Sequence, residues 1–138
     1  MACVFHPSHL SMIETADQIT AVMRATGVGL CPDTGDLAAA GNDPVAVIRD
    51  NAARITYAHL KGVRHKPFGF TPLDRGDVAL APVLEALKLA KGVSWICVEL
   101  DLWNDPEDGA GLNAAWLRRV LGPDVLPNQA VAADDSPV

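Results

Sequence analysis

Residues 28–36 read VGLCPDTGD, a short apolar run that ends in Pro32 and is followed by an aspartate, Asp33. An uninterrupted apolar run of this length is typical of a strand that is covered on both faces, as in a parallel sheet. The Asp-Thr-Gly that follows is typical of a turn. This stretch therefore predicts a buried strand that delivers a carboxylate to its carboxyl end.

The same pattern recurs three more times, as apolar runs over residues 2–5, 55–58 and 93–98. A segment with the apolar spacing of a helix follows each of the four runs. The chain is therefore an α/β protein in which a strand and a helix alternate four times, and this order predicts a parallel sheet with helices outside it.

Helix start and stop signals bound these segments. Thr15 begins the first helix as an N-cap, and Asp43 followed by a proline begins the second. The third and fourth helices are expected over about residues 81–91 and 109–121, each closed by a glycine.

The chain divides into one folded domain, residues 1–121, and a tail, residues 122–138. The tail has no helix or strand period and carries acidic but no basic residues, so we expect it to be flexible. The whole chain has 11 Lys and Arg against 17 Asp and Glu, a formal net charge of −6. This balance disfavours nucleic acids and anionic membranes as partners, because both require clustered basic side chains.

The cysteines and the N-terminus indicate a cellular compartment. Cys3, Cys31 and Cys97 lie far apart in apolar runs, as buried reduced thiols do. The N-terminus lacks the pattern of a signal peptide, and no apolar run is long enough to span a bilayer. We therefore expect a cytoplasmic protein that does not enter a membrane.

Each predicted strand is followed by side chains that can bind a metal ion or a substrate. Because the carboxyl ends of parallel strands form one face, Asp33, His59 and Glu99 are expected to point into one cavity. Mixed carboxylate and imidazole donors suit zinc, manganese, cobalt or magnesium with open positions for a substrate.

Each of these residues also has an ordinary structural explanation. Asp33 would serve as a turn former or a helix cap, and His59 as a core histidine. Glu99 is harder to explain in this way because it lies between Val98 and Leu100, and burying a carboxylate in a strand is costly without a cation or a donor. The three residues together favour a shared site.

The chain resembles the second half of the xylose-isomerase-like TIM barrels, over about residues 2–121. The motifs that carry the resemblance are VGLCPDTG (28–35), RITYAHLK (54–61), FTPLDRGDV (70–78) and VELD (98–101). This superfamily contains sugar isomerases and epimerases, inosose dehydratase and apurinic endonucleases. The resemblance implies half of a (β/α)8 barrel that acts on a small sugar or keto-polyol.

The resemblance also implies a divalent metal ion, Mn²⁺, Co²⁺, Zn²⁺ or Mg²⁺. The family holds it with a Glu, an Asp, a His and a second Glu, of which Asp33, His59 and Glu99 match the last three by position. The first Glu is missing, and His6 or His9 would substitute for it or contact the substrate. In isomerisation, epimerisation or dehydration, Glu99 would carry the proton removed next to the carbonyl.

Some positions depart from the family pattern. Asp36 stands where the family has a substrate-contacting His, and Gly62 stands where it has an Asp. Lys61 and Arg64 would lie near the mouth of the site and hold an anionic group of the substrate or an enediolate. The other interpretation of this pair is a solvated basic loop.

A complete barrel needs eight β/α units, typically about 250 residues, and this chain has four units. Two chains that close one barrel, a missing N-terminal half, or a half-barrel without metal or catalysis would each account for this length. Open strand edges and an apolar inner face predict self-association as a homodimer. An apurinic endonuclease is disfavoured by the acidic net charge, and also because four histidines are too few for a site that holds several zinc ions.

Overall fold

The computed structural model describes residues 3–125. Its centre consists of four short parallel strands, β1 (Val4–Phe5), β2 (Gly29–Leu30), β3 (Tyr57–Leu60) and β6 (Trp95–Val98). β1 pairs with β2 and β3 pairs with β6, while single parallel bridges from Leu30 to Ile55 and from Asp33 to His59 join the two pairs. The strands thus lie in chain order, as expected for consecutive β/α units.

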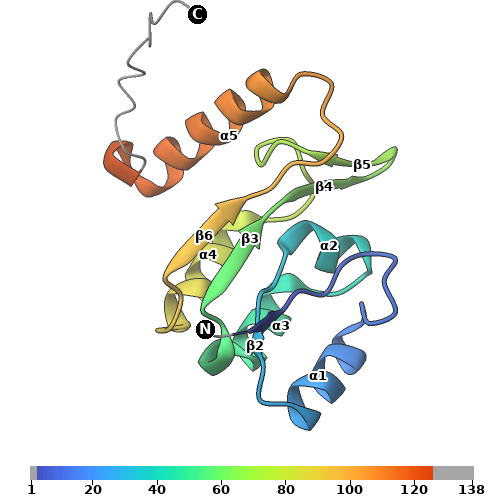
Figure 1. Cartoon of the computed structure of the whole chain (residues 1–138). Coiled ribbons are helices and arrows are strands. Elements are labelled where there is room, and N and C mark those ends of the chain that lie inside the picture. Colours follow the sequence, from blue (N-terminus) through green and yellow to red (C-terminus); the bar gives the residue numbers. More distant parts are fainter. Residues whose placement is uncertain (1–2, 126–138) are drawn as a thin grey trace, which may run out of the picture.

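Helices follow the strands as predicted (Figure 1), with differences at their ends. The α-helices are α1 (Ala16–Ala25), α2 (Thr34–Ala39), α3 (Pro44–Asp50), α4 (Leu80–Leu89) and α5 (Pro106–Leu121). Thr15 caps α1 and Asp43 caps α3, which confirms both predicted starts. α5 begins before residue 109 because the side chain of Asp105 accepts hydrogen bonds from two N–H groups of its first turn. Within residues 3–125, no helix is long and apolar enough to cross a membrane.

Two elements were not predicted from the sequence. One is α2, the short helix that begins directly after Asp33. The other is an antiparallel hairpin formed by β4 (Gly62–His65) and β5 (Phe68–Thr71), which follows β3 after a single residue. Figure 1 shows this hairpin beyond the carboxyl end of β3, on the face where the site was expected.

The core lies between the parallel strands and the helices α1, α3 and α4. Its most buried members include Ile19 of α1, Leu30 of β2, Ile48 of α3, Leu60 of β3 and Val83 of α4, each without solvent exposure. The helices therefore bury one apolar face each against the sheet, which is the arrangement that their periodicity predicted.

Two predictions about burial were wrong. The strand at 93–98 was expected to be covered on both faces, but Trp95 of β6 is 72% exposed because β6 is the last strand of the described sheet. For the same reason Cys97 is exposed, as is Cys3 at the start of β1, whereas Cys31 is buried as predicted.

Two short 3-10 turns complete the described chain, η1 (Ala52–Arg54) and η2 (Pro123–Val125). η2 contains the first residues of the predicted flexible tail, so the helical region extends slightly past α5. The rest of that tail, residues 126–138, lies outside the described residues.

Candidate functional site

Backbone hydrogen bonds bring the ends of the four parallel strands to one level. The N–H of Cys31 donates to Phe5 O at 2.8 Å, and the N–H of His59 donates to Pro32 O at 2.9 Å. On the other side of β3, the N–H of Glu99 donates to Leu60 O at 3.0 Å. This register places the side chains that follow each strand side by side.

Four of these side chains converge on one point. Ligand atoms of His6, Asp33, His59 and Glu99 all lie within 4.8 Å of one another. His59 Nδ1 lies at the centre of this metal-donor cluster, 3.2 Å from His6 Nε2, 3.5 Å from Asp33 Oδ2 and 2.5 Å from Glu99 Oε2. The structure thus brings together the three residues predicted to bind a metal and His6, one of the two histidines expected to substitute for the missing Glu.

The two oxygens of Asp33 face different partners. Oδ1 accepts a hydrogen bond from the N–H of Asp36 at 2.8 Å and caps α2. Oδ2 has no partner with hydrogen-bond geometry, although Asp33 is completely buried. It points toward the two histidines, at 3.8 Å from His6 Nε2 and 3.5 Å from His59 Nδ1. The Lys61 ammonium lies 3.5 Å from the same oxygen but without hydrogen-bond geometry, so Oδ2 has positive charge nearby and no donor of its own. A buried oxygen without a donor is costly, and a cation bound beside the histidines would satisfy it.

Lys61 is the charged group at the base of the site. Its side chain is 2% exposed, and carboxylates surround its ammonium. The Nζ atom lies 2.6 Å from Glu99 Oε1, 3.0 Å from Asp101 Oδ2 and 3.5 Å from carboxylate oxygens of Asp33 and Asp36. It also lies over the ring of Phe70, 4.7 Å from its centre. The interpretation of Lys61 as part of a solvated basic loop is therefore wrong, because four carboxyl groups surround the ammonium.

These contacts shift several pKa values. Burial raises the pKa of Asp33, but His6, the N–H of Asp36 and the charge of Lys61 outweigh it, so the net pKa is lowered. The carboxylate of Asp33, 3.8 Å from His6 Nε2, raises the pKa of His6. Burial lowers this pKa, but by less. Burial lowers the pKa of Lys61, but the hydrogen bond to Glu99 and the surrounding carboxylates raise it by more. The net pKa is therefore raised, and Lys61 remains charged at neutral pH.

Asp36 and Cys31 have raised pKa values. The cause for Asp36 is burial, followed by repulsion from the charge of Asp33, which Lys61 offsets only in part. Burial raises the pKa of the Cys31 thiol to about 12, so the thiol is neutral in the absence of an ion.

The metal-donor cluster fits a divalent cation on two grounds. First, four carboxyl groups surround Lys61, the one ammonium among them, so a double positive charge is not repelled overall. Second, His59 Nδ1 faces His6, Asp33 and Glu99 together, and one proton on this nitrogen cannot satisfy all three. A single cation among the four donors would satisfy them, and imidazole and carboxylate are the ligands that such metals use.

Other predicted site residues lie elsewhere. His9 contacts Glu14, with 3.4 Å between Nδ1 and Oε2, and its ring lies against Phe68. Arg64 is half-buried in β4 and donates to the backbone oxygen of Arg75 at 3.4 Å, so it is part of the hairpin rather than of the cluster. Neither residue has a described contact with the four donors.

Sequence reasoning missed two members of the site. Asp101 was not singled out as a partner of Lys61, although it lies two residues after Glu99 and therefore on the same side of an extended chain. Cys31 lies two residues before Asp33, so it too is on the same side of an extended chain. Its sulfur lies within 4.8 Å of ring nitrogens of His6 and His59. The period of two within a strand was the signal that would have found both.

The structure explains one departure from the family pattern. A Cβ atom on Gly62 would lie 2.5 Å from the backbone oxygen of Thr71 and 2.8 Å from that of Pro72. The hairpin closes so tightly over this position that an Asp does not fit there.

Comparison with known proteins agrees with this architecture. The sequence profile of the family described as xylose isomerase-like TIM barrel matches residues 4–120. An inosose dehydratase of Clostridium tetani (strain Massachusetts / E88) is 29% identical over 121 residues, 73% of this chain and 41% of that protein. The rhizopine catabolism protein MocC of Rhizobium meliloti is 30% identical over an alignment of 148 positions, 94% of this chain and 44% of that protein.

Solved structures show the same fold. An L-ribulose 3-epimerase superposes with a TM-score of 0.70 and 20% identity, over 99% of this chain and 52% of that chain. A xylose isomerase-like TIM barrel protein from Mycobacterium smegmatis, in complex with magnesium, superposes with a TM-score of 0.66 and 20% identity, over 89% and 44%. The chain spans about half the length of the proteins that it matches. It belongs to the xylose isomerase-like TIM barrel family and forms half of such a barrel.

Proposed function

We propose that this half-barrel carries the metal centre of an isomerase, epimerase or dehydratase that removes a proton next to the carbonyl of a sugar or keto-polyol. The observation that carries the proposal is the metal-donor cluster, in which the buried Asp33 Oδ2 has no hydrogen-bond partner. The names of the relatives support it, because they include inosose dehydratases and a sugar epimerase. The substrate class is accordingly a small polyhydroxy ketone.

His6, Asp33, His59 and Glu99 would hold the ion in this proposal. A bound divalent ion would polarise the substrate carbonyl and so acidify the adjacent C–H bond. The choice among manganese, cobalt, zinc and magnesium is left to titration, because this donor set accommodates each of them.

Glu99 is the residue that we assign to proton transfer. Its side chain is 32% exposed, whereas Asp33 is buried, so Glu99 is the carboxylate of the cluster that a substrate carbon can approach. Lys61 Nζ lies 2.6 Å from Glu99 Oε1 and so fixes the orientation of this carboxylate, which a general base requires. Because the Lys61 side chain is 2% exposed, its role in this proposal is to position Glu99 and not to contact the substrate.

The alternative is a half-barrel that binds no metal and has no activity. Two observations favour it: His6 replaces the Glu with which the family begins its ligand set, and the chain covers about half of its relatives. Metal titration separates the two functions, because the alternative predicts no stoichiometric binding.

The first test is calorimetric titration of chelator-treated protein with Mn²⁺. We expect one site per chain and loss of that site in Asp33→Ala. Because Asp33 also caps α2, Asp33→Asn is the sharper variant: its amide oxygen still accepts the capping bond but its side chain is uncharged. Asp74→Ala, which removes an exposed aspartate, serves as the matched control and should bind as the wild type does. Absence of binding by the wild type would refute the metal centre.

The second test is turnover of keto-inositols and ketose sugars by the Mn²⁺-loaded protein. Glu99→Gln removes both a metal ligand and the proposed base, so we expect it to abolish metal binding and to lower turnover by at least about 10²-fold. Turnover that survives in Glu99→Gln would show that another group carries the proton.

A further inference from the structure

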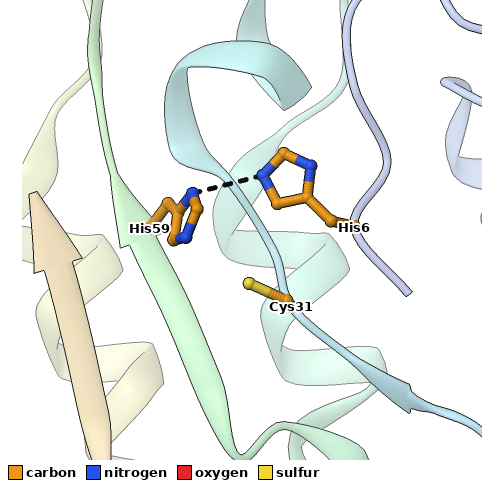
Figure 2. A group of neighbouring side chains, drawn as sticks. All are labelled: His6, Cys31 and His59. Carbon is orange, nitrogen blue, oxygen red and sulfur yellow. Dashed lines mark hydrogen bonds between the residues drawn. The ribbon is translucent and has the colours of Figure 1, made fainter. Parts of the chain in front are cut away.

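Cys31 forms a second donor set with the two site histidines, one that does not include Glu99. His6, Cys31 and His59 make one set and His6, Asp33, His59 and Glu99 make the other, each with ligand atoms within 4.8 Å of one another. Figure 2 shows the three side chains of the first set converging from three separate segments. We infer that Cys31 is a thiolate ligand that lets this centre bind soft divalent ions such as zinc and cadmium. This inference deepens the proposed function and rests on it.

The position of Cys31 follows from the strand register. It comes directly after β2, and its N–H donates to the backbone oxygen of Phe5, the residue before His6. Since Asp33 lies two residues further along an extended segment, both side chains face the interior of the half-barrel. Cys31 is 2% exposed and is a free thiol, so its sulfur is held beside the histidines and shielded from solvent.

A second feature points to a cation at this place. Asp33 Oδ2 is buried without a hydrogen-bond partner, 3.5 Å from Lys61 Nζ, and it also faces His6 Nε2 and His59 Nδ1, the two residues that Cys31 groups with. The sulfur and the unpartnered oxygen thus converge on one pair of imidazoles. A thiolate and two imidazoles are donors that zinc and cadmium bind well, and Asp33 adds negative charge beside them.

The chemistry of the sulfur sets the metal preference. On binding, the S–H bond of Cys31 breaks, a bond from sulfur to the metal forms, and one proton leaves to solvent. Manganese and magnesium prefer oxygen ligands, whereas zinc, cobalt and cadmium accept thiolate. Because both donor sets use His6 and His59, they compete for the same two imidazoles, and the softness of the ion decides whether it is bound with Cys31 or with the carboxylates.

Cobalt tests this inference directly, because a Co²⁺ ion bound to thiolate shows an intense near-ultraviolet charge-transfer band in addition to its weak visible bands. We expect this band in the wild type loaded with Co²⁺ and its loss when a chelator removes the ion. The double variant Cys3→Ser/Cys97→Ser, in which Cys31 is the one remaining thiol, should keep the band. Cys31→Ser should lose it while calorimetry still detects Co²⁺ bound through the other donors.

The outcomes separate this inference from the proposed function. Stoichiometric Co²⁺ binding without the band, in the wild type and in the double variant, overturns the role of Cys31 and leaves the metal centre standing. A band that persists in Cys31→Ser also overturns it. No binding of Co²⁺ to the wild type overturns the metal centre and the inference together. If Cys31→Ser does not fold, the double variant alone decides the matter.

Discussion

Lys61 is the residue on which the electrostatics of the site depend. One buried ammonium faces the carboxyl groups of Asp33, Asp36, Glu99 and Asp101, the last two at 2.6 and 3.0 Å. Burying an ion is costly, but removing one partner from a buried ionic group costs more, because it leaves the others without compensation. Lys61 is therefore a structural requirement of the site whatever its part in the chemistry.

Replacing this side chain tests that dependence. Lys61→Met keeps the length of the chain but removes the charge, and we expect it to lower the free energy of unfolding by about 3–5 kcal/mol. Urea denaturation at pH 7 without metal measures the loss. Lys88→Met is the matched control: Lys88 pairs with Glu85 at 2.6 Å on the exposed face of α4, and its loss should cost less than about 1 kcal/mol. Equal losses in the two variants would contradict the assigned role of the buried ammonium.

Asp33 shows how far sequence reasoning reaches at the level of one side chain. The sequence leaves two interpretations open, a helix cap and a ligand of a shared site. The structure supports the first for Oδ1, which caps α2, and leaves Oδ2 without a hydrogen-bond partner beside the histidines and Lys61. The sequence treats these as alternatives because it specifies residue types, whereas the two oxygens differ only in what surrounds them.

At the level of elements, the register of the parallel strands was predictable and the insertions were not. Polar residues after apolar runs predicted that Asp33, His59 and Glu99 would meet, and their donor atoms do. The hairpin over residues 62–71 contains three glycine and proline residues within ten positions, which is typical of a loop, and its pairing depends on a close approach at Gly62. α2 is too short for its apolar period to be visible.

Burial of charge was also beyond sequence reasoning. Lys61 is buried because carboxylates from two other segments, residues 33–36 and 99–101, reach it, and no local pattern encodes such a meeting. In the same way, the exposure of Trp95 depends on what lies beyond the edge of β6, since the run 93–98 has the composition of a covered strand.

A single arginine ties the first β/α unit to the second. The Arg54 guanidinium, at the end of η1, donates to the backbone oxygens of Met23, Thr26 and Val28, the last at the start of the segment that forms β2. These oxygens belong to the carboxyl end of α1 and to the loop that follows, where helical partners are lacking. Arg54 thus closes the α1–β2 connection from outside.

We therefore expect Arg54→Ala to destabilise the fold by about 1.5–3 kcal/mol, the loss of hydrogen bonds from a charged donor. Arg54→Lys should rescue little of this, because a single ammonium cannot reproduce the planar fork that serves all three oxygens. Thermal unfolding followed by circular dichroism measures both variants. Arg49→Ala, an exposed arginine on α3, is the control and should unfold as the wild type does. A wild-type unfolding temperature for Arg54→Ala would show that water replaces the arginine without loss.

On the scale of the whole molecule, the described sheet has an open side. Beside β6 lies a groove of about 800 Å³ between this strand and α5, lined by apolar side chains that include Ile96, Val98, Leu117 and Trp103. Trp95 and the outer edge of β6 border it, and at the other end of the sheet Val4 of β1 is 38% exposed. Exposed apolar strand edges favour association.

The expectation of self-association remains a prediction, and it has a definite geometry. In a barrel closed by two copies, the β6 edge of each chain would pair with the β1 edge of its partner. Light scattering at micromolar concentration should then give about twice the chain mass of 14.6 kDa, and Trp95→Lys should shift the protein to the monomer. Lys91→Ala, which changes an exposed residue before β6, should leave the mass unchanged. A monodisperse wild-type monomer would contradict the prediction.

The metal-donor cluster lies entirely within one continuous run of β/α units. His6, Asp33, His59 and Glu99 each follow or belong to a different strand of the described sheet, with His6 and Glu99 directly after the two end strands, β1 and β6. If these four residues hold the proposed ion, the centre can be inherited, duplicated or fused as a single piece of gene, since one run of β/α units supplies all four donors. Whatever covers the open side is free to diverge in sequence, and selection on what enters the cavity can act there without disturbing the ligands.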